Sequence, residues 1–278
     1  MEEFKVEYIP ALPSVMLELM RFDPSNPDSD GQALERIIMP DKGICSEVLR
    51  VANSALYGRS GKIKDIRGAI TLMGVKPTKN LVILLSTKSI HGKLKGDTYK
   101  RNLVEYPIVS ALVAIDLARP AGRGALREDA FLGALLHKIG MTIIGLNRPD
   151  NYNQLLDRSA RGEGELSELE RSELNTDHIK VGEMIFEAWK IPQEMRDIIT
   201  RHDEDPAGFG EGDDLVRLVS LAGMIARKML GLWSTEQDEA RRAVLAKHFG
   251  LGEDKLAIFE NGYYEQIKDH PFYEQAMA

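Results

Sequence analysis

The chain has 278 residues, of which 43% are hydrophobic and 28% are charged, so it resembles an ordinary globular protein with enough length to bury a sizeable core. Its formal net charge of −7 argues against dedicated binding of duplex DNA, which uses many cations to neutralise phosphates. The single cysteine, Cys45, excludes an internal disulfide framework and cysteine-ligated zinc.

Nothing in the sequence predicts contact with a membrane. The densest apolar run, residues 81–85, is far shorter than the roughly 18 residues that a spanning helix needs. The first residues, MEEFKVEYIP, are acidic and lack the basic-then-apolar layout of a secretion signal. We therefore expect a cytoplasmic protein.

Helix signals dominate the chain from its start. Pro13 opens the stretch PSVMLELM, and a proline in the first turn of a helix leaves no hydrogen bond unmade. Ser29 followed by Gln32 fits a capping box at the start of the next helix. Alternating apolar runs typical of strands are few. The sequence predicts an all-α fold.

The stretch RVANSALYG at residues 50–58 predicts the end of a buried helix. Its apolar core candidates are Leu49, Val51, Ala52 and Ala55. Asn53 and Ser54 are small polar groups near that end, and the Asn53 side chain can tie the following loop through hydrogen bonds. Gly58 suits a helix stop. This segment is either a packed turn or an interaction surface, for which Asn53, Ser54 and Gly58 are the candidates.

Basic residues gather between positions 62 and 101. This segment holds ten Lys or Arg and two Asp, a net charge of +8, which leaves −15 for the remainder. It is either a solvated basic face or a site for an anionic ligand, for which Lys93 and Lys95 are candidates. An RNA contact is a further alternative, but only Tyr57 and Tyr99 offer stacking nearby.

A polar stretch at residues 91–100 predicts a linker between two helical lobes, 1–95 and 96–278. In the second lobe, His137 lies in FLGALLHKIGMTIIG, which is apolar on nearly every side and predicts a central helix. His178 begins DHIKVGEMIFEAWK, a helix capped by Asn175 or Thr176 and ending before Pro192. The predicted apolar face of that helix holds Val181, Met184, Ile185, Ala188 and Trp189.

The third histidine of interest, His202, ends the helix EMRDIITRH, where a protonated imidazole is favourable. Each of His137, His178 and His202 has such a structural explanation. Together they could also hold a divalent metal. No carboxylate is evident beside them, and Lys138 follows His137. A unit charge about 4 Å from a divalent ion, at an effective dielectric of about 20, costs roughly 8 kcal/mol. We therefore expect no bound metal and no cofactor.

Several motifs resemble known families. GALLHKIG resembles the LLHDIG signature of HD-domain phosphohydrolases, with Lys138 in place of the aspartate. LPSVMLELM, IIMPDKGICSEVLRVANSALYG and KIKDIRGAITLMG resemble HDOD proteins, the HD-related output domains of bacteria. HIKVGEMIFEAWKIP and ITRHDEDP resemble later blocks of that family, so the resemblance covers about residues 9–260.

The resemblance implies an all-α protein whose second lobe is a degenerate HD-type bundle. HD enzymes carry a further His upstream and an Asp downstream as metal ligands. Those positions fall near residues 104–111 and 220–226, where this chain has no His and no acid, respectively. The implied function is a non-enzymatic signalling module that binds a protein partner or a small anionic ligand, with Lys138 and Trp189 as further interaction candidates. The alternative is a divergent metal-dependent phosphohydrolase that uses His137, His178 and His202.

Overall fold

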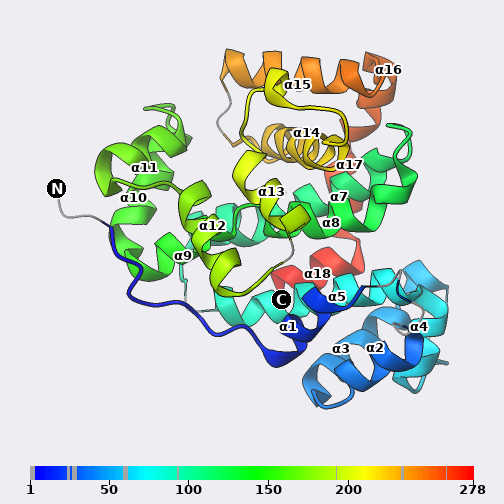
Figure 1. Ribbon diagram of the computed structural model, residues 1–278. Helices are drawn as coiled ribbons and strands as arrows, with labels where there is room; N and C mark the ends of the chain where they lie inside the picture. The colour runs from blue at the N-terminus through cyan, green and yellow to red at the C-terminus, as the bar shows by residue number, and fades with distance from the viewer. Residues whose placement is uncertain are drawn as a thin grey trace. The chain divides into compact units, whose positions relative to one another are not determined.

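A computed structural model describes residues 4–23, 26, 30–58, 62–92, 94–191, 193–232, 235–260 and 262–278, except the side chain of Glu194. These residues form helices and turns, and no strand occurs among them (Figure 1). The predicted all-α fold is confirmed. The predicted capping residue Ser29, the helix-ending Pro192 and the basic Lys93 lie outside the described residues.

The chain forms two compact units, of which unit 2 comprises residues 10–92 and 268–278. Its helices are α1 (Ser14–Arg21), α2 (Gly31–Ile38), α3 (Lys42–Ala52), η1 (Ala55–Tyr57), α4 (Ile66–Met73), α5 (Val75–His91) and α18 (Pro271–Met277). The apolar helix α5 is the centre of this unit, because α1, α2, α3, α4 and α18 all pack against it. Asp30 caps α2 by accepting a hydrogen bond from the Ala33 amide.

The turn after α3 is tied as its sequence predicts. The Asn53 side chain donates to the carbonyls of Leu49 and Ile63 at 2.9 Å each and accepts from the Ile63 amide at 3.1 Å. Gly58 has a left-handed φ of +63° and ends η1. Of the predicted core residues here, Val51 and Ala52 are buried, Leu49 is half-buried and Ala55 is exposed.

Unit 1 comprises residues 1–9 and 93–267. Its helices are α6 (Asp97–Tyr99), η2 (Lys100–Glu105), α7 (Tyr106–Ala118), η3 (Gly124–Leu126), α8 (Arg127–Leu136), α9 (Ile139–Asn147), α10 (Pro149–Ala160), α11 (Leu166–Leu174), α12 (His178–Ala188), α13 (Gln193–Arg201), η4 (Pro206–Gly208), α14 (Asp214–Met229), α15 (Glu236–His248), α16 (Glu253–Leu256), η5 (Ala257–Phe259) and α17 (Tyr263–Lys268).

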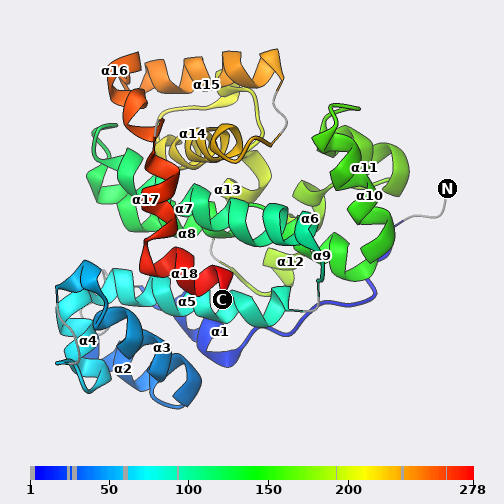
Figure 2. The ribbon, with the colours of Figure 1, turned by 180° about the vertical axis from the view of Figure 1, so that it is seen from behind.

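The core of unit 1 is a layer of α7, α8 and α14, with α12 packed on α9. Figure 2 shows α17 crossing α7, and there the Tyr263 hydroxyl donates to Asp116 at 2.7 Å. The units differ from the predicted lobes at both ends of the chain. Residues 1–9 belong to unit 1 through hydrogen bonds of Glu7 and Tyr8 to Asn147, and residues 268–278 belong to unit 2 because α18 packs on α5.

The predicted single central helix around His137 is wrong. It is two helices, α8 and α9, separated by a turn at His137 and Lys138, where the Lys138 backbone leaves the helical region. The turn places two consecutive polar side chains inside an otherwise apolar stretch. Among the described residues, Gly124–Asn147 is long and apolar enough to cross a membrane, but 89% of its most apolar part is buried in the protein. Its place in the core accounts for this apolar character.

Helix α12 differs from its prediction at its cap and on its buried face. Its cap is Asp177, which accepts from the Lys180 amide at 2.9 Å, rather than Asn175 or Thr176. Met184 and Ala188 are exposed, so they do not belong to the apolar face. The buried residues of the helix are His178, Val181, Gly182, Ile185 and Phe186.

Candidate functional site

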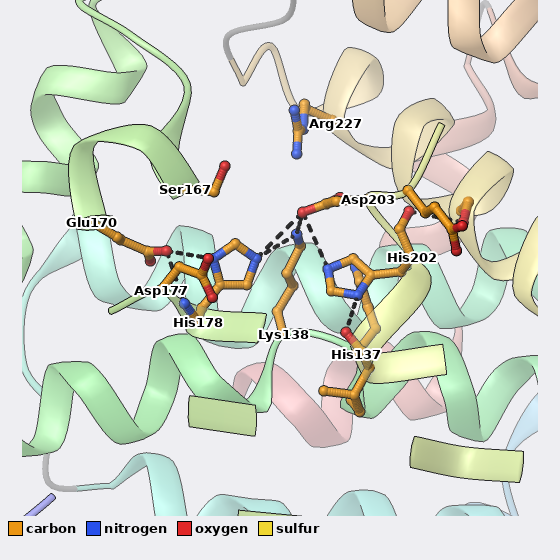
Figure 3. A network of polar contacts seen from close by, with 12 residues as sticks. His137, Lys138, Ser167, Glu170, Asp177, His178, His202, Asp203 and Arg227 are labelled. Atoms are coloured by element: carbon orange, nitrogen blue, oxygen red, sulfur yellow. Dashed lines mark hydrogen bonds and ion pairs between the residues drawn. The ribbon is translucent and has the colours of Figure 1, made fainter. Parts of the chain in front are cut away.

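The three predicted histidines converge inside unit 1. His137 comes from the turn between α8 and α9, His178 begins α12, and His202 follows α13 (Figure 3). All three side chains are 2% exposed. The ring centres of His137 and His202 are 5.1 Å apart, and those of His178 and His202 are 5.8 Å apart.

Lys138 points into this cluster. Its Nζ lies 2.8 Å from Asp203 Oδ2 and 3.0 Å from His178 Nε2. Its side chain is 4% exposed, and the Asp203 side chain is 29% exposed. Burial lowers the pKa of the ammonium, whereas Asp203 raises it. Burial alone would raise the pKa of Asp203, but His202 and Lys138 outweigh it and hold that pKa well below 3.8. The net effect on the Lys138 pKa is a decrease, and the 2.8 Å contact between the two groups is an ion pair.

Glu170 of α11 sets the orientation of His178. Its Oε2 accepts from the His178 amide at 2.9 Å and lies 2.6 Å from His178 Nδ1, while Tyr152 donates its hydroxyl to Oε1. Nδ1 therefore carries a proton, and Nε2 can accept from Lys138. Burial lowers the pKa of His178 and Glu170 raises it, with a net increase. The 3.0 Å contact between Lys138 Nζ and His178 Nε2 is a hydrogen bond to the imidazole when His178 is neutral.

The other two imidazoles use Nδ1 to bind backbone carbonyls. His202 Nδ1 lies 2.7 Å from the Ile199 carbonyl, as expected for a histidine at a helix end. Its Nε2 is buried 3.3 Å from Asp203 Oδ2 without the alignment of a hydrogen bond. His137 Nδ1 donates to the Ala134 carbonyl at 2.6 Å, and its Nε2 faces the Tyr106 hydroxyl at 3.4 Å.

The ligand atoms of His178, His202 and Asp203 lie within 4.8 Å of one another, which is the spacing of a metal site. However, the Lys138 ammonium is within hydrogen-bond distance of two of these ligands, at 2.8 Å from Asp203 and 3.0 Å from His178, and its charge repels an ion. The Nε2 of His137 faces Tyr106 and does not join the set. With Lys138 in this position, the residues present do not fit a divalent metal.

The HD resemblance implies a further His and an Asp as metal ligands, and this chain has neither. The two corresponding positions are adjacent in the fold. Gly223, in the segment where an Asp was expected, would place a Cβ 3.0 Å from the Tyr106 hydroxyl and 3.5 Å from His137 Nε2. Tyr106 lies in the segment where the further His was expected. The Tyr106 side chain thus fills space that an acidic side chain at position 223 would need.

The expectation that no carboxylate lies beside the histidines was wrong. Asp203 contacts Lys138 and Glu170 contacts His178. The sequence shows Asp203 directly after His202, but only the fold brings its carboxylate against Lys138. Glu170 is one of several acids in the charged stretch 158–177, and only the packing of α11 on α12 distinguishes it. Sequence reasoning also missed Tyr106 and Arg227.

The other predicted interaction residues do not belong to this cluster. Asn53, Ser54 and Gly58 lie in unit 2, where the Ser54 hydroxyl oxygen is buried with no hydrogen-bond partner among the described residues. Trp189 is 8% exposed and packs beside Phe186, so it offers little surface to a partner. Their role in interactions stays a prediction.

The basic segment 62–101 divides between the two units. Several of its cations have intramolecular partners: Arg67 pairs with Glu35 at 3.0 Å, Lys79 donates to the Phe22 carbonyl at 2.9 Å, and Arg101 donates to the Leu230 carbonyl. These contacts support a structural role for part of the segment. An anionic ligand there stays a prediction.

A polar cavity of about 340 Å³ opens above the Lys138 ammonium. Lys138, His178, Asp203 and Tyr106 line its floor. Its walls come from α10 and α11 on one side and from α14 and α15 on the other. The cluster is therefore reachable by a small molecule.

The histidine cluster should make stability depend on pH. Burial lowers the pKa of His137 well below 6.5, and the positive charges of His202 and Lys138 lower it further. The unfolded chain then binds a proton at a higher pH than the folded chain, so the free energy of unfolding falls as the pH drops below 6.5. Burial makes His202 act in the same direction, whereas the raised pKa of His178 opposes it.

We expect the free energy of unfolding to fall between about pH 7 and pH 5, by at most about 1.4 kcal/mol per pH unit for each histidine that resists protonation. A His137→Gln variant should show a shallower slope in urea titrations across that range. His248→Gln removes a surface imidazole, 38% exposed, and is the control. Equal slopes in wild type and His137→Gln would contradict the assignment.

Comparison with known proteins agrees with this geometry. The family model of the HDOD domain matches residues 9–205. An uncharacterised protein of Treponema pallidum (strain Nichols) is 24% identical over 249 residues, or 87% of this chain. The chain spans about half the length of that relative, 46%.

Three solved structures have a similar fold. An HDOD domain protein of unknown function from Geobacter sulfurreducens has a TM-score of 0.76 at 17% identity and covers 97% of this chain and 93% of its own. A protein described provisionally as a signal transduction protein, from Marinobacter aquaeolei VT8, has a TM-score of 0.74 at 20% identity. The match covers 97% of this chain and 59% of that protein's chain. A protein described provisionally as a phosphohydrolase, from Shewanella amazonensis SB2B, has a TM-score of 0.70 at 21% identity. The match covers 98% of this chain and 96% of that protein's chain.

These identities are low, so the structural likeness is evidence of fold alone. The family match covers well over half of the chain and includes the motifs around Asn53, Lys138 and His202. The chain belongs to the HDOD domain family.

Proposed function

We propose that this protein is a non-enzymatic regulatory module of a bacterial signalling pathway, which acts by binding a protein partner or a small anionic ligand. One observation carries the proposal: the Lys138 ammonium lies 2.8 Å from Asp203 and 3.0 Å from His178, among the groups that would otherwise bind a metal. An HD-type hydrolase uses a metal to activate water, and this internal cation opposes one.

The signal transduction protein of similar fold from Marinobacter aquaeolei is consistent with this role. The buried network supports it as well, because Lys138, Glu170 and Asp203 join the α8–α9 turn to α11, α12 and the end of α13. A ligand that disturbs one of these contacts would affect several helices at once.

The alternative is a divergent metal-dependent phosphohydrolase. The spacing of His178, His202 and Asp203 within 4.8 Å and the phosphohydrolase-named structure from Shewanella amazonensis favour it. For that function Lys138 would have to leave the cluster or lose its proton.

Metal analysis and a hydrolysis assay separate the two. Protein purified without a histidine tag should contain far less than one equivalent of Mn, Fe, Co, Ni or Zn by mass spectrometry. It should not hydrolyse p-nitrophenyl or bis(p-nitrophenyl) phosphate when these metals are added. Stoichiometric metal, or metal-dependent turnover abolished by Asp203→Asn, would overturn the proposal.

A further inference from the structure

We infer that the cavity above Lys138 is a binding site for a small oxyanion, a carboxylate or a phosphate, and that Arg227 and Arg241 hold it. This inference rests on the proposed function, since it names the ligand class of the same site. The two arginines lie on α14 and α15, so this anion site differs from the one that the sequence suggests in the basic segment 62–101. The argument begins with the hydrogen-bond capacity of the cavity wall.

Arg227 has donors to spare. Its guanidinium carries five N–H groups. Its partners within the described part of the chain are Asp238 Oδ2, at a long 3.4 Å, and the Tyr106 hydroxyl, which leaves several of these groups without an acceptor. The side chain lines the cavity and is 22% exposed. Figure 3 shows Arg227 on the Asp203 side of the cluster, and no ion pair between the two is found among the described residues. Neighbouring acids and Tyr106 outweigh burial and raise the pKa of Arg227, so it stays charged.

Arg241, on the adjacent helix, also lacks acceptors. It donates one Nη2 hydrogen to the Glu204 carbonyl at 2.7 Å. Its Nη1 is 4.0 Å from Asp238, and its Nε is buried with no hydrogen-bond partner among the described residues. The side chain lines the same cavity at 16% exposure. The guanidinium of Arg241 is therefore not saturated by protein acceptors, and a bound oxyanion could accept a charge-assisted hydrogen bond from it.

Two of the four acids that line the cavity, Asp203 and Asp238, are engaged by other groups, whereas Glu165 and Glu168 are not paired with Arg227 or Arg241 among the described residues. Lys138 pairs with Asp203. Asp238 accepts from the Thr235 amide and hydroxyl in a capping box, at 3.0 and 3.1 Å. Burial and the charge of Asp238 raise the pKa of Glu165. The lining thus holds four acids and four Lys or Arg side chains, but Arg227 and Arg241 keep guanidinium donors without acceptors among the described residues, and an anionic ligand fits these donors.

The volume limits the ligand to a small molecule. About 340 Å³ lies at the lower end of small-molecule pockets and holds several times the roughly 30 Å³ of one water. Neutral polar side chains complete the lining and could bind hydroxyl groups of the same ligand: Asn102, Ser159, Ser167, Thr235 and Gln237. An extended polyanion would not fit inside.

The test is calorimetric titration of the full chain with inorganic phosphate and, separately, with acetate at low ionic strength. We expect millimolar or tighter binding of at least one probe, and the tighter one identifies the ligand as phosphorylated or as a carboxylate. Arg227→Gln should weaken binding by about tenfold or more, Arg227→Lys should have an intermediate effect because it keeps the charge but loses the planar fork, and Arg241→Gln should also weaken binding.

Arg119→Gln is the matched control, because Arg119 is exposed and does not line the cavity. Thermal melting of each variant confirms that it is folded. The inference is overturned if neither probe binds, or if Arg119→Gln lowers affinity as much as Arg227→Gln does. A failure of anion binding would not affect the proposal that the protein is non-enzymatic. Conversely, metal-dependent turnover would overturn the proposed function, but it would not contradict anion binding in the cavity.

Discussion

Gly140→Ala should cost more than about 4 kcal/mol of unfolding free energy and lower the melting temperature by about 10 °C or more. Gly140 starts α9 where this helix crosses α12, and a Cβ there would lie 1.8 Å from the His178 carbonyl oxygen and 2.8 Å from the Gly182 amide nitrogen. Both contacts are with backbone, so no side-chain rotation relieves them. Only a separation of the two helices can make room, and it would expose their buried faces.

Thermal and urea unfolding followed by circular dichroism measure this effect. Gly124→Ala is the matched control, since a Cβ at Gly124 would meet no atom within 4 Å, and its effect should stay within about 0.5 kcal/mol. If Gly140→Ala unfolds like the control, the close crossing of α9 and α12 is not present in the protein.

This crossing also shows where prediction from sequence ends. The helical pattern and the motif resemblance predicted the all-α fold, the Asn53 turn and His137, His178 and His202 as one candidate site, because each depends on local signals. Gly140 stands inside the motif GALLHKIG, yet nothing local shows that another backbone touches it. A close approach between segments about 40 residues apart is a property of packing alone.

The same distinction explains the missed acids. Glu170 is one of many charged residues in a stretch that predicts an exposed helix, and its burial follows from the position of α11 against His178. The sequence shows Lys138 beside His137 but not the partner of its ammonium. A buried ammonium needs a counter-ion, and Asp203 lies 65 residues away in the chain.

Lys138→Met should convert the cluster into a metal site. The substitution keeps an unbranched stem of similar size and removes the charge, which frees His178 Nε2 and Asp203 Oδ2 as ligands beside His202. The repulsion of a divalent ion by an ammonium about 4 Å away is roughly 8 kcal/mol at an effective dielectric of about 20. If half of it is relieved in practice, zinc affinity should rise about a thousandfold.

Lys138→Asp should bind at least as tightly as Lys138→Met, because it adds a carboxylate at the position where HD enzymes carry one. Competition with a fluorescent zinc chelator measures both affinities, and melting curves with and without zinc confirm that the metal binds the folded chain. Lys180→Met removes the same charge from an exposed position of α12 and controls for net charge. Gains equal to that of Lys180→Met would show that Lys138 does not keep metal out, and the case for a non-enzymatic module would lose its main support. A large gain confined to position 138 would mean that one side chain separates this cluster from a metal centre.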